Sequence, residues 1–397
     1  MKLYPFDIFC VIVFGLSLIS LVHTYILFPL ILDLLSKGKK PLKTFYPDSD
    51  PELPSVSILL AVYNEEKVIE NKIQSTFKTT YPLDKIEFLI GSDASTDETN
   101  AIINRYRLQY PQIKLVEFMG RTGKSGIIND LAEKAQNKIF ILTDANVFFN
   151  EDTLYQLVKY YKDPDISLAG GNILNHRFKK DGISYQEKSY LSRENKIKYL
   201  EGILWGAMIG AFGGCYSVRR DYYSQVPPMF FMDDFYITMN VLEHHGKTIN
   251  NLDALCNEDV SNKISEEFRR KVRISIGNFQ NFGRYRKLLW PPWTGLAFAF
   301  LSHKVLRWLG PFFIILLLIS NALLWDKTIL FKILLIGQLI MLCMPVLDIM
   351  LKKLNIHVFL LRFISHFYLM NLALLIGFFK FINGVESNVW KPTQRYQ

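Results

Sequence analysis

Cysteine is scarce in this chain, whose 397 residues include four: Cys10, Cys215, Cys256 and Cys343. They show neither a paired spacing nor a Cys-x-x-Cys motif, so the sequence predicts neither a disulfide framework nor a zinc site. Internal repeats and low-complexity segments are also absent, which argues against a repeat architecture.

Charge is missing from several long stretches. Half of the residues are hydrophobic and 14% are aromatic, which is rich for a purely soluble protein. Residues 6–35 are nearly free of charge, are too long for a secretory signal and precede no small-residue cleavage site, so we expect a retained transmembrane helix. Three further apolar runs cover residues 309–325, 329–350 and 357–381.

These runs predict a membrane protein with one globular domain. We expect an N-terminal transmembrane helix and basic flank in 1–47, a globular domain in 48–292, an interfacial segment in 293–308, about three C-terminal transmembrane helices in 309–382 and a tail in 383–397. His303, Lys304 and Arg307 are interpreted as marking the membrane interface.

Basic residues predict the orientation. Lys37, Lys39, Lys40 and Lys43 follow the first helix, whereas only Lys2 precedes it, so the positive-inside bias puts the globular domain in the cytosol of an inner or plasma membrane protein. The net charge of +9 suits anionic lipid headgroups and a phosphate-bearing substrate. The cytosolic flanks of membrane proteins are basic in any case.

The globular segment alternates between strand and helix patterns. Apolar runs predict strands over 56–62, 86–91, 113–118 and 138–142, and helical spacing predicts helices over 65–77, from Ser95 onward and over 124–135. Strands separated by helices of this length indicate an α/β fold with a doubly wound parallel sheet. A long helix is expected over 185–205.

Polar clusters follow three of these strands: Tyr63-Asn64-Glu65-Glu66, Ser92 to Asp97, and Thr143-Asp144-Ala145-Asn146. The carboxyl ends of such strands meet at one rim, where α/β sheets bind ligands. Asp144 and Asn146 can share a divalent cation or a ribose, while Gly123-Lys124 opens a helix and can seat a phosphate. Each cluster alone could equally be a turn.

The ordered motifs resemble those of family 2 glycosyltransferases with the GT-A fold. The resemblance rests on the three rim clusters, Gly123-Lys124 with Asn129, Gly213-Gly214-Cys215, Met232-Asp233-Asp234 and Arg269-Arg270-Lys271-Val272-Arg273. The membrane helices are similar to those of hyaluronan, cellulose and poly-N-acetylglucosamine synthases. The family implies a GT-A nucleotide-diphospho-sugar transferase domain flanked by transmembrane helices, with a UDP-linked hexosyl or N-acetylhexosaminyl donor.

The resemblance also implies roles for individual residues. Asp234 would be the catalytic base, and Asp144 with Asn146 would bind Mg²⁺ or Mn²⁺. Contacts to the nucleotide sugar would come from Tyr63, Glu65, Asp93, Lys124, Asp144 and Arg273. Groups that orient or contact the acceptor would be Asp233, Gly214, Cys215 and Arg270.

Each role has a structural alternative. Asp93 could cap a helix, Lys124 could be an exposed first-turn lysine, and Asp234 could be the N-cap of a helix over 235–244. The basic run around Arg273 could be a solvated helix face.

The sequence departs from the family's pattern at two places. Asn146 replaces the second aspartate of the usual Asp-x-Asp motif, so a metal would depend more on the diphosphate. In the Gln-x-x-Arg-Trp motif, Arg273 falls on the arginine, Arg270 on the glutamine and Ile274 on the tryptophan. The aromatic platform that stacks on acceptor sugars is therefore missing, which argues against processive polymerisation.

The leading hypothesis is an inverting glycosyltransferase that makes a surface polysaccharide or glycolipid at the cytosolic face. Its expected partners are a nucleotide sugar, a saccharide or lipid-linked acceptor and membrane lipids, without nucleic acid. A processive synthase that extrudes its product, a nucleotidyltransferase, and a transporter or scaffold with a degenerate nucleotide-binding domain remain alternatives.

Overall fold

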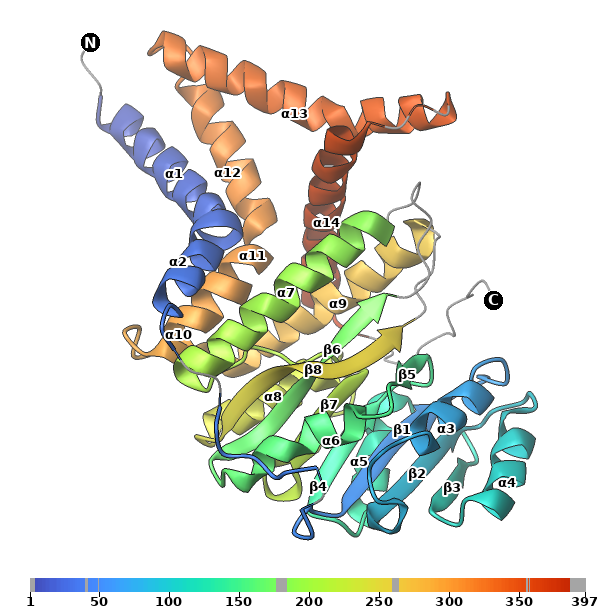
Figure 1. Cartoon of the computed structure of the whole chain (residues 1–397). Coiled ribbons are helices and arrows are strands. Elements are labelled where there is room, and N and C mark those ends of the chain that lie inside the picture. Colours follow the sequence, from blue (N-terminus) through green and yellow to red (C-terminus); the bar gives the residue numbers. More distant parts are fainter. Residues whose placement is uncertain are drawn as a thin grey trace.

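The centre of the α/β domain is an eight-stranded mixed sheet (Figure 1), seen in a computed structural model that describes residues 4–39, 42–48, 50–175, 184–258, 264–354, 356 and 358–385. The strand order is β3-β2-β1-β4-β7-β6-β8-β5. The bounds are β1 Val56–Val62, β2 Ile86–Asp93, β3 Ile113–Phe118, β4 Ile139–Thr143, β5 Val147–Phe149, β6 Ile166–Asn175, β7 Cys215–Arg219 and β8 Lys247–Glu258.

The predicted parallel pairing is right for part of the sheet. Strands β3, β2, β1 and β4 are parallel, and β6 is parallel to β8, whereas β7 is antiparallel to both β4 and β6, and β5 is antiparallel to β8. The alternation ends after β4 because β5 follows within four residues, too short a link for a parallel crossover.

Both faces of the sheet are buried, which explains why β1 is a continuous apolar run. On β1, Ile58 and Leu60 belong to the core that contains Ile69 of helix α3 (Ile69–Phe77). Leu59 faces the other core, with Ile127 of helix α5 (Lys124–Lys134). The remaining helices of the domain are α4 Thr99–Gln109, α6 Thr153–Val158, α7 Ser184–Trp205, α8 Asp233–Glu243 and α9 Ile264–Tyr285.

Two predicted helix starts are wrong. Helix α3 begins at Ile69 rather than at Glu65, and helix α4 begins at Thr99 rather than at Ser95. The carboxylate of Asp97 accepts a hydrogen bond from the Thr99 backbone N–H (3.1 Å), so the polar residues that looked like a helical first turn form the turn before the helix.

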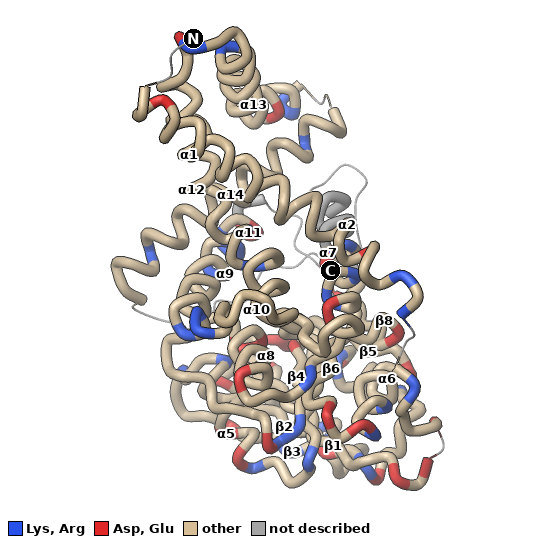
Figure 2. The backbone as a smooth tube through the Cα atoms, turned by 90° about the vertical axis from the view of Figure 1, so that its left-hand side faces the viewer, with Lys and Arg blue, Asp and Glu red and all other residues tan. Residues whose placement is uncertain are grey.

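Apolar helices form a second part of the molecule, and α7 and α9 lie between them and the sheet (Figure 1). Their bounds are α1 Pro5–Val22, α2 Phe28–Leu35, α10 Gly295–Ala299, α11 Leu306–Trp308, α12 Gly310–Leu323, α13 Ile329–Lys353 and α14 Phe359–Ile382. Figure 2 shows that charged residues gather on the α/β part and are sparse on these helices.

Three of the described helices are long and apolar enough to cross a membrane: residues 5–35, α13 and α14. A fourth span would need the pair Gly295–Trp308 and Gly310–Leu323, which is bent by 64° at Gly310-Pro311. Proline at this point cannot continue the hydrogen bonding of the preceding helix. Most of the predicted tail, 386–397, lies outside the described residues.

The N-terminal apolar helix is not a separate anchor. Phe28 and Leu32 of α2 are fully buried and belong to the same core as Leu59 of the sheet. The end of this helix is therefore part of the α/β domain's packing.

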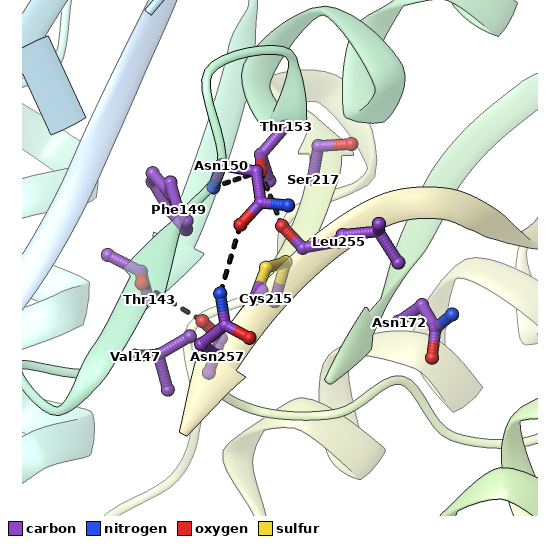
Figure 3. Close-up of a disulfide and its surroundings, with 12 residues drawn as sticks. Thr143, Val147, Phe149, Asn150, Thr153, Asn172, Cys215, Ser217, Leu255 and Asn257 are labelled. Atoms are coloured by element: carbon purple, nitrogen blue, oxygen red, sulfur yellow. Dashed lines mark hydrogen bonds between the residues drawn. A yellow bond between two sulfur atoms is a disulfide. The ribbon is translucent and has the colours of Figure 1, made fainter. Parts of the chain in front are cut away.

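The prediction that the cysteines are unpaired is wrong for two of them. Cys215 of β7 and Cys256 of β8 form a disulfide (Figure 3), while Cys10 and Cys343 are free. Strand β6 separates β7 from β8, and its Gly171 lets the sulfurs meet, since a Cβ at this position would lie 2.4 Å from the Cys215 Sγ. Only the order of strands brings together two cysteines 41 residues apart.

Candidate active site

Three elements distant in the sequence meet at the carboxyl end of the parallel strands. The Lys124 ammonium, at the start of α5, lies 2.8 Å from an Asp144 carboxylate oxygen and 3.4 Å from one of Asp233. Burial alone would lower the pKa of Lys124, but the two carboxylates outweigh it and raise that pKa. The predicted phosphate-binding lysine therefore occupies the centre of an acidic rim.

Asp93 determines how the chain enters α5. Its buried carboxylate accepts hydrogen bonds from the Arg121 side chain (2.9 Å) and from the backbone N–H groups of Thr122 (2.5 Å) and Gly123 (3.2 Å). Gly123, with φ +84°, is the residue before α5 and adopts a conformation that favours glycine. Asp93 thus does not cap α4, which was its alternative role, and its contact with a nucleotide stays a prediction.

The loop after β1 lies beside this arrangement. The Arg121 guanidinium stacks on the Tyr63 ring at 3.3 Å. The backbone N–H of Glu65 donates to the Thr99 hydroxyl at 2.9 Å, which ties the β1 loop to the start of α4. Tyr63 and Glu65 therefore belong to the same rim as Asp93, as predicted from strand order.

Asp144 and Asn146 occupy the β4–β5 loop. Gly214 lies against this loop, because a Cβ there would come within 2.5 Å of the Val147 side chain and 3.5 Å of the Asp144 carboxylate. The Asn146 side-chain amide donates to the Glu258 carboxylate at 3.2 Å. Sequence reasoning missed Glu258, because only the pairing of β5 with β8 brings it to this loop.

The donor set fits a divalent cation only in part. Asp144 and Asn146 offer oxygen atoms of the type that Mg²⁺ and Mn²⁺ bind. Across the described ranges, no group of three His, Cys, Asp or Glu side chains could hold a metal ion. Oxygen atoms of a bound diphosphate would have to complete the coordination.

Lys72 is a second residue that sequence reasoning missed. Its fully buried ammonium donates to the Thr143 hydroxyl (2.7 Å) and the Val147 carbonyl (2.6 Å), on either side of the Asp144–Asn146 segment. Burial lowers the pKa of Lys72, and Asp144 opposes that shift. The sequence did contain a signal for the burial of Lys72, because this lysine falls between Ile69 and Thr76 on the apolar face of the helix.

Asp234 is the second residue of α8, so its alternative role as an N-cap is wrong. It is buried, with 8% of its surface exposed, and one carboxylate oxygen accepts the Phe235 backbone N–H at 2.8 Å. Burial and the neighbouring Asp233 raise its pKa to about 6, against the lowering effects of Lys124, the Phe235 N–H and Lys198. A carboxylate of this basicity can accept a proton near neutral pH.

Helix α9 brings its cations to the same rim. A Cβ at Gly277 would lie 2.6 Å from the Met232 side chain, so this face of α9 packs on the segment that leads into α8. Desolvation and Arg270 lower the pKa of Arg273, whereas the nearby carboxylates of Asp144 and Asp233 oppose that change. Arg270 itself lies 3.7 Å from Glu267.

The Cys215 side chain is not available for the predicted contact with an acceptor. The Cys215 sulfur is bonded to Cys256 and buried in the core of the sheet, so its thiol cannot contact an acceptor. The His303 side chain, predicted to mark the membrane interface, is fully buried, and its ring lies between Glu194 and Glu201.

Sequence and structure comparisons agree on one class of protein. Residues 57–226 match the profile of Glycosyl transferase family 2. Beta-monoglucosyldiacylglycerol synthase of Synechocystis sp. is 37% identical over 113 residues, 28% of this chain and 24% of that protein. Poly-beta-1,6-N-acetyl-D-glucosamine synthase of Staphylococcus epidermidis is 26% identical over 122 residues, 30% of this chain and 29% of that protein.

The fold is also that of a solved glycosyltransferase. The mannosyltransferase PcManGT from Pyrobaculum calidifontis, solved with GDP-Man and Mn²⁺, superposes with a TM-score of 0.69 at 18% identity, over 93% of this chain and 99% of that one. The sheet therefore has the GT-A fold. The family match covers residues 57–226, so this segment of the chain is a glycosyl transferase family 2 domain. It matches about a quarter of the length of the curated relatives.

Proposed function

We propose that the protein is an inverting glycosyltransferase that moves a hexosyl or N-acetylhexosaminyl group from a nucleotide sugar to a saccharide or lipid-linked acceptor. The observation that supports this most is the meeting of Lys124, Asp144 and Asp233 within 3.4 Å, with Asp234 beside them. A cation balanced by carboxylates at this rim can exchange them for the diphosphate of a donor.

Asp234 acts as the general base in this proposal. The acceptor hydroxyl loses its proton to the Asp234 carboxylate while its oxygen bonds to the anomeric carbon of the donor. The bond from that carbon to the diphosphate oxygen breaks on the opposite face, so the configuration inverts. Lys124 and Arg273 stabilise the charge that develops on the leaving diphosphate.

A divalent cation, Mg²⁺ or Mn²⁺, would add to this charge stabilisation when bound. Asp144 and Asn146 would hold it, and Glu258 would orient the Asn146 amide by accepting its N–H. Because Asn146 is neutral, we expect the cation to bind weakly until the diphosphate is present.

We further propose single addition to a lipid-linked acceptor at the cytosolic face. Ile274 offers no ring on which a growing polymer could stack. The relative named beta-monoglucosyldiacylglycerol synthase supports a lipid acceptor, and the lysines after α2 support the cytosolic orientation. We propose UDP as the nucleotide of the donor.

Release of nucleoside diphosphate by the purified protein in lipid tests this proposal, with UDP-glucose, UDP-N-acetylglucosamine and GDP-mannose as donors. We expect UDP release from one UDP-sugar, loss of release in Asp234→Asn, and a product larger than its acceptor by one sugar. A nucleotidyltransferase would release no nucleoside diphosphate from these donors, but would release pyrophosphate when given UTP and a sugar 1-phosphate. A scaffold would turn over no donor, which would overturn the proposal.

A further inference from the structure

One face of α7 carries three buried charged residues. Glu194, Lys198 and Glu201 are spaced by four and three residues, which places them on the same side of the helix. None is more than 3% exposed. Burying a charged group costs on the order of several kcal/mol unless nearby partners compensate for the lost hydration. The surroundings of each of the three residues must therefore account for its burial.

The two glutamates are compensated by the segment between α10 and α12. His303 bridges them, with Nδ1 2.7 Å from Glu201 and Nε2 2.9 Å from Glu194. Glu194 also pairs with Lys304 and with Arg307, the latter at 2.9 Å. The second oxygen of Glu201 accepts the Ile209 backbone N–H at 3.0 Å, which fixes the chain that leads to Phe212.

Lys198 has a different environment. In the described part of the chain, its ammonium has no carboxylate within ion-pair distance and lies 3.5 Å from the centre of the Phe212 ring. The next residue, Gly213, contacts the base, since a Cβ there would lie 3.1 Å from an Asp234 carboxylate oxygen. Lys198 and Asp234 therefore contact successive residues of one loop.

Charged groups from several elements act on this pair. Burial and Lys304 lower the pKa of Lys198 to about 7, while Glu194, Asp234 and Glu201 oppose that change. Asp234 faces Asp233 on its own helix, Lys124 of α5 and Lys198 of α7, and the Tyr216 hydroxyl of β7 is within its electrostatic reach. Lys124 is already held by two carboxylates, so Lys198 is the cation that lacks such a partner among those acting on Asp234.

We propose that Lys198 is a positioning residue for sugar transfer: its ammonium, held on the Phe212 ring, keeps the Asp234 carboxylate ionised and ready to take the acceptor's proton. This inference rests on the proposed role of Asp234 as the base. Removing the cation should raise the proton affinity of Asp234. The acid limb of the reaction then moves to higher pH, and a shift of one pKa unit costs about tenfold in rate on that limb.

The first test is the pH dependence of kcat/KM for the full-length protein in lipid, with the UDP-sugar that supports turnover. We expect the acid limb of Lys198→Met to move to higher pH, with larger losses at pH 6 than at pH 8. Lys198→Arg keeps a cation at all these pH values and should keep the acid limb of the wild type. Equal losses at every pH, or the same shift in Lys198→Arg, would overturn the proposal.

The second test needs no turnover. In infrared spectra, the band of the protonated Asp234 carboxyl is the one that disappears in Asp234→Asn. We expect this band to titrate at higher pH in Lys198→Gln than in the wild type, and an unchanged titration would contradict the proposal. If the band shifts but no donor is turned over, the electrostatic interaction between Lys198 and Asp234 is supported and the proposed function fails.

Discussion

Single residues at the rim combine burial with opposing charge. Lys124 keeps its proton because Asp144 and Asp233 surround it, and Asp234 gains basicity because it is buried beside Asp233. These neighbours come from three elements, so each ionisation state depends on the fold rather than on local sequence. Replacing one member should therefore change chemistry more than it changes folding.

Asp234→Asn should abolish transfer while leaving nucleotide binding close to normal, because the lost group acts on the acceptor's proton. A general base typically contributes about 10²–10⁴-fold. Initial rates and UDP affinity measured on the same preparation check this. Asp221→Asn, at an exposed aspartate in the short 3-10 helix Arg220–Tyr222, is the control, and near-normal turnover in Asp234→Asn would remove Asp234 from the mechanism.

The pH dependence of wild-type activity should follow the ionisation of the Asp234 carboxylate. The pKa of Asp234 is raised to about 6, and the base works only when ionised. Activity should therefore be fully present above this value and should fall as the pH drops through about 6. An acid limb near pH 4, where an ordinary aspartate titrates, would contradict the burial argument.

Asn146→Asp should tighten the binding of Mn²⁺ in the presence of UDP, because it adds a carboxylate beside Asp144. Without metal the new carboxylate would face Glu258, where Asn146 now donates a hydrogen bond, so the apo variant should be less stable than the wild type. Paramagnetic resonance of free Mn²⁺ and thermal unfolding measure the two effects. Adding Glu258→Gln should relieve the instability, whereas unchanged Mn²⁺ affinity would place the cation elsewhere.

At the scale of elements, α7 connects the segment before α12 to the rim. His303→Ala removes the hydrogen-bonded bridge between two buried carboxylates, and leaving a buried polar group without its partner typically costs about 1–3 kcal/mol. We expect a lower thermal midpoint in detergent together with reduced activity. His244→Ala, at an exposed histidine, is the control and should leave the midpoint nearly unchanged.

Helix α9 carries the predicted acceptor contact, because it contains the segment Arg270 to Ile274 that matches the family motif. Since Ile274 replaces the aromatic residue of the family motif, we expect short or single additions by the purified enzyme in lipid with excess donor. Mass analysis of the product decides this. Long polymers made without a second subunit would contradict this prediction and would indicate a processive synthase.

The sequence predicts the parallel half of the sheet well, because β1, β2 and β4 are apolar runs that end in polar clusters. It predicts the other half poorly, because the β4–β7 and β5–β8 pairs depend on contacts across more than 70 residues that no alternation of strand and helix signals. Glu258 was missed for that reason, whereas Lys72 left a signal as a lysine on the apolar face of α3. The buried partners of His303 could not be predicted, since both glutamates lie more than 100 residues earlier.

For the whole molecule, the globular and apolar parts share one core. Residues 48–292, produced alone, would lack Phe28, His303 and the cations that neutralise Glu194. We expect this fragment to lack a cooperative thermal transition, and Glu194→Gln with Glu201→Gln to restore part of it. A fragment that unfolds at the temperature of the full chain would contradict this.

The His303 bridge also sets an order of events during synthesis. Glu194 and Glu201 leave the ribosome 109 and 102 residues ahead of the histidine that pairs with them. Domains generally begin to fold from the N-terminal side as the chain emerges, yet this one must keep two glutamates hydrated until the segment before α12 arrives. Completion of the α/β domain must therefore wait until the segment that precedes its last apolar helices has been synthesised.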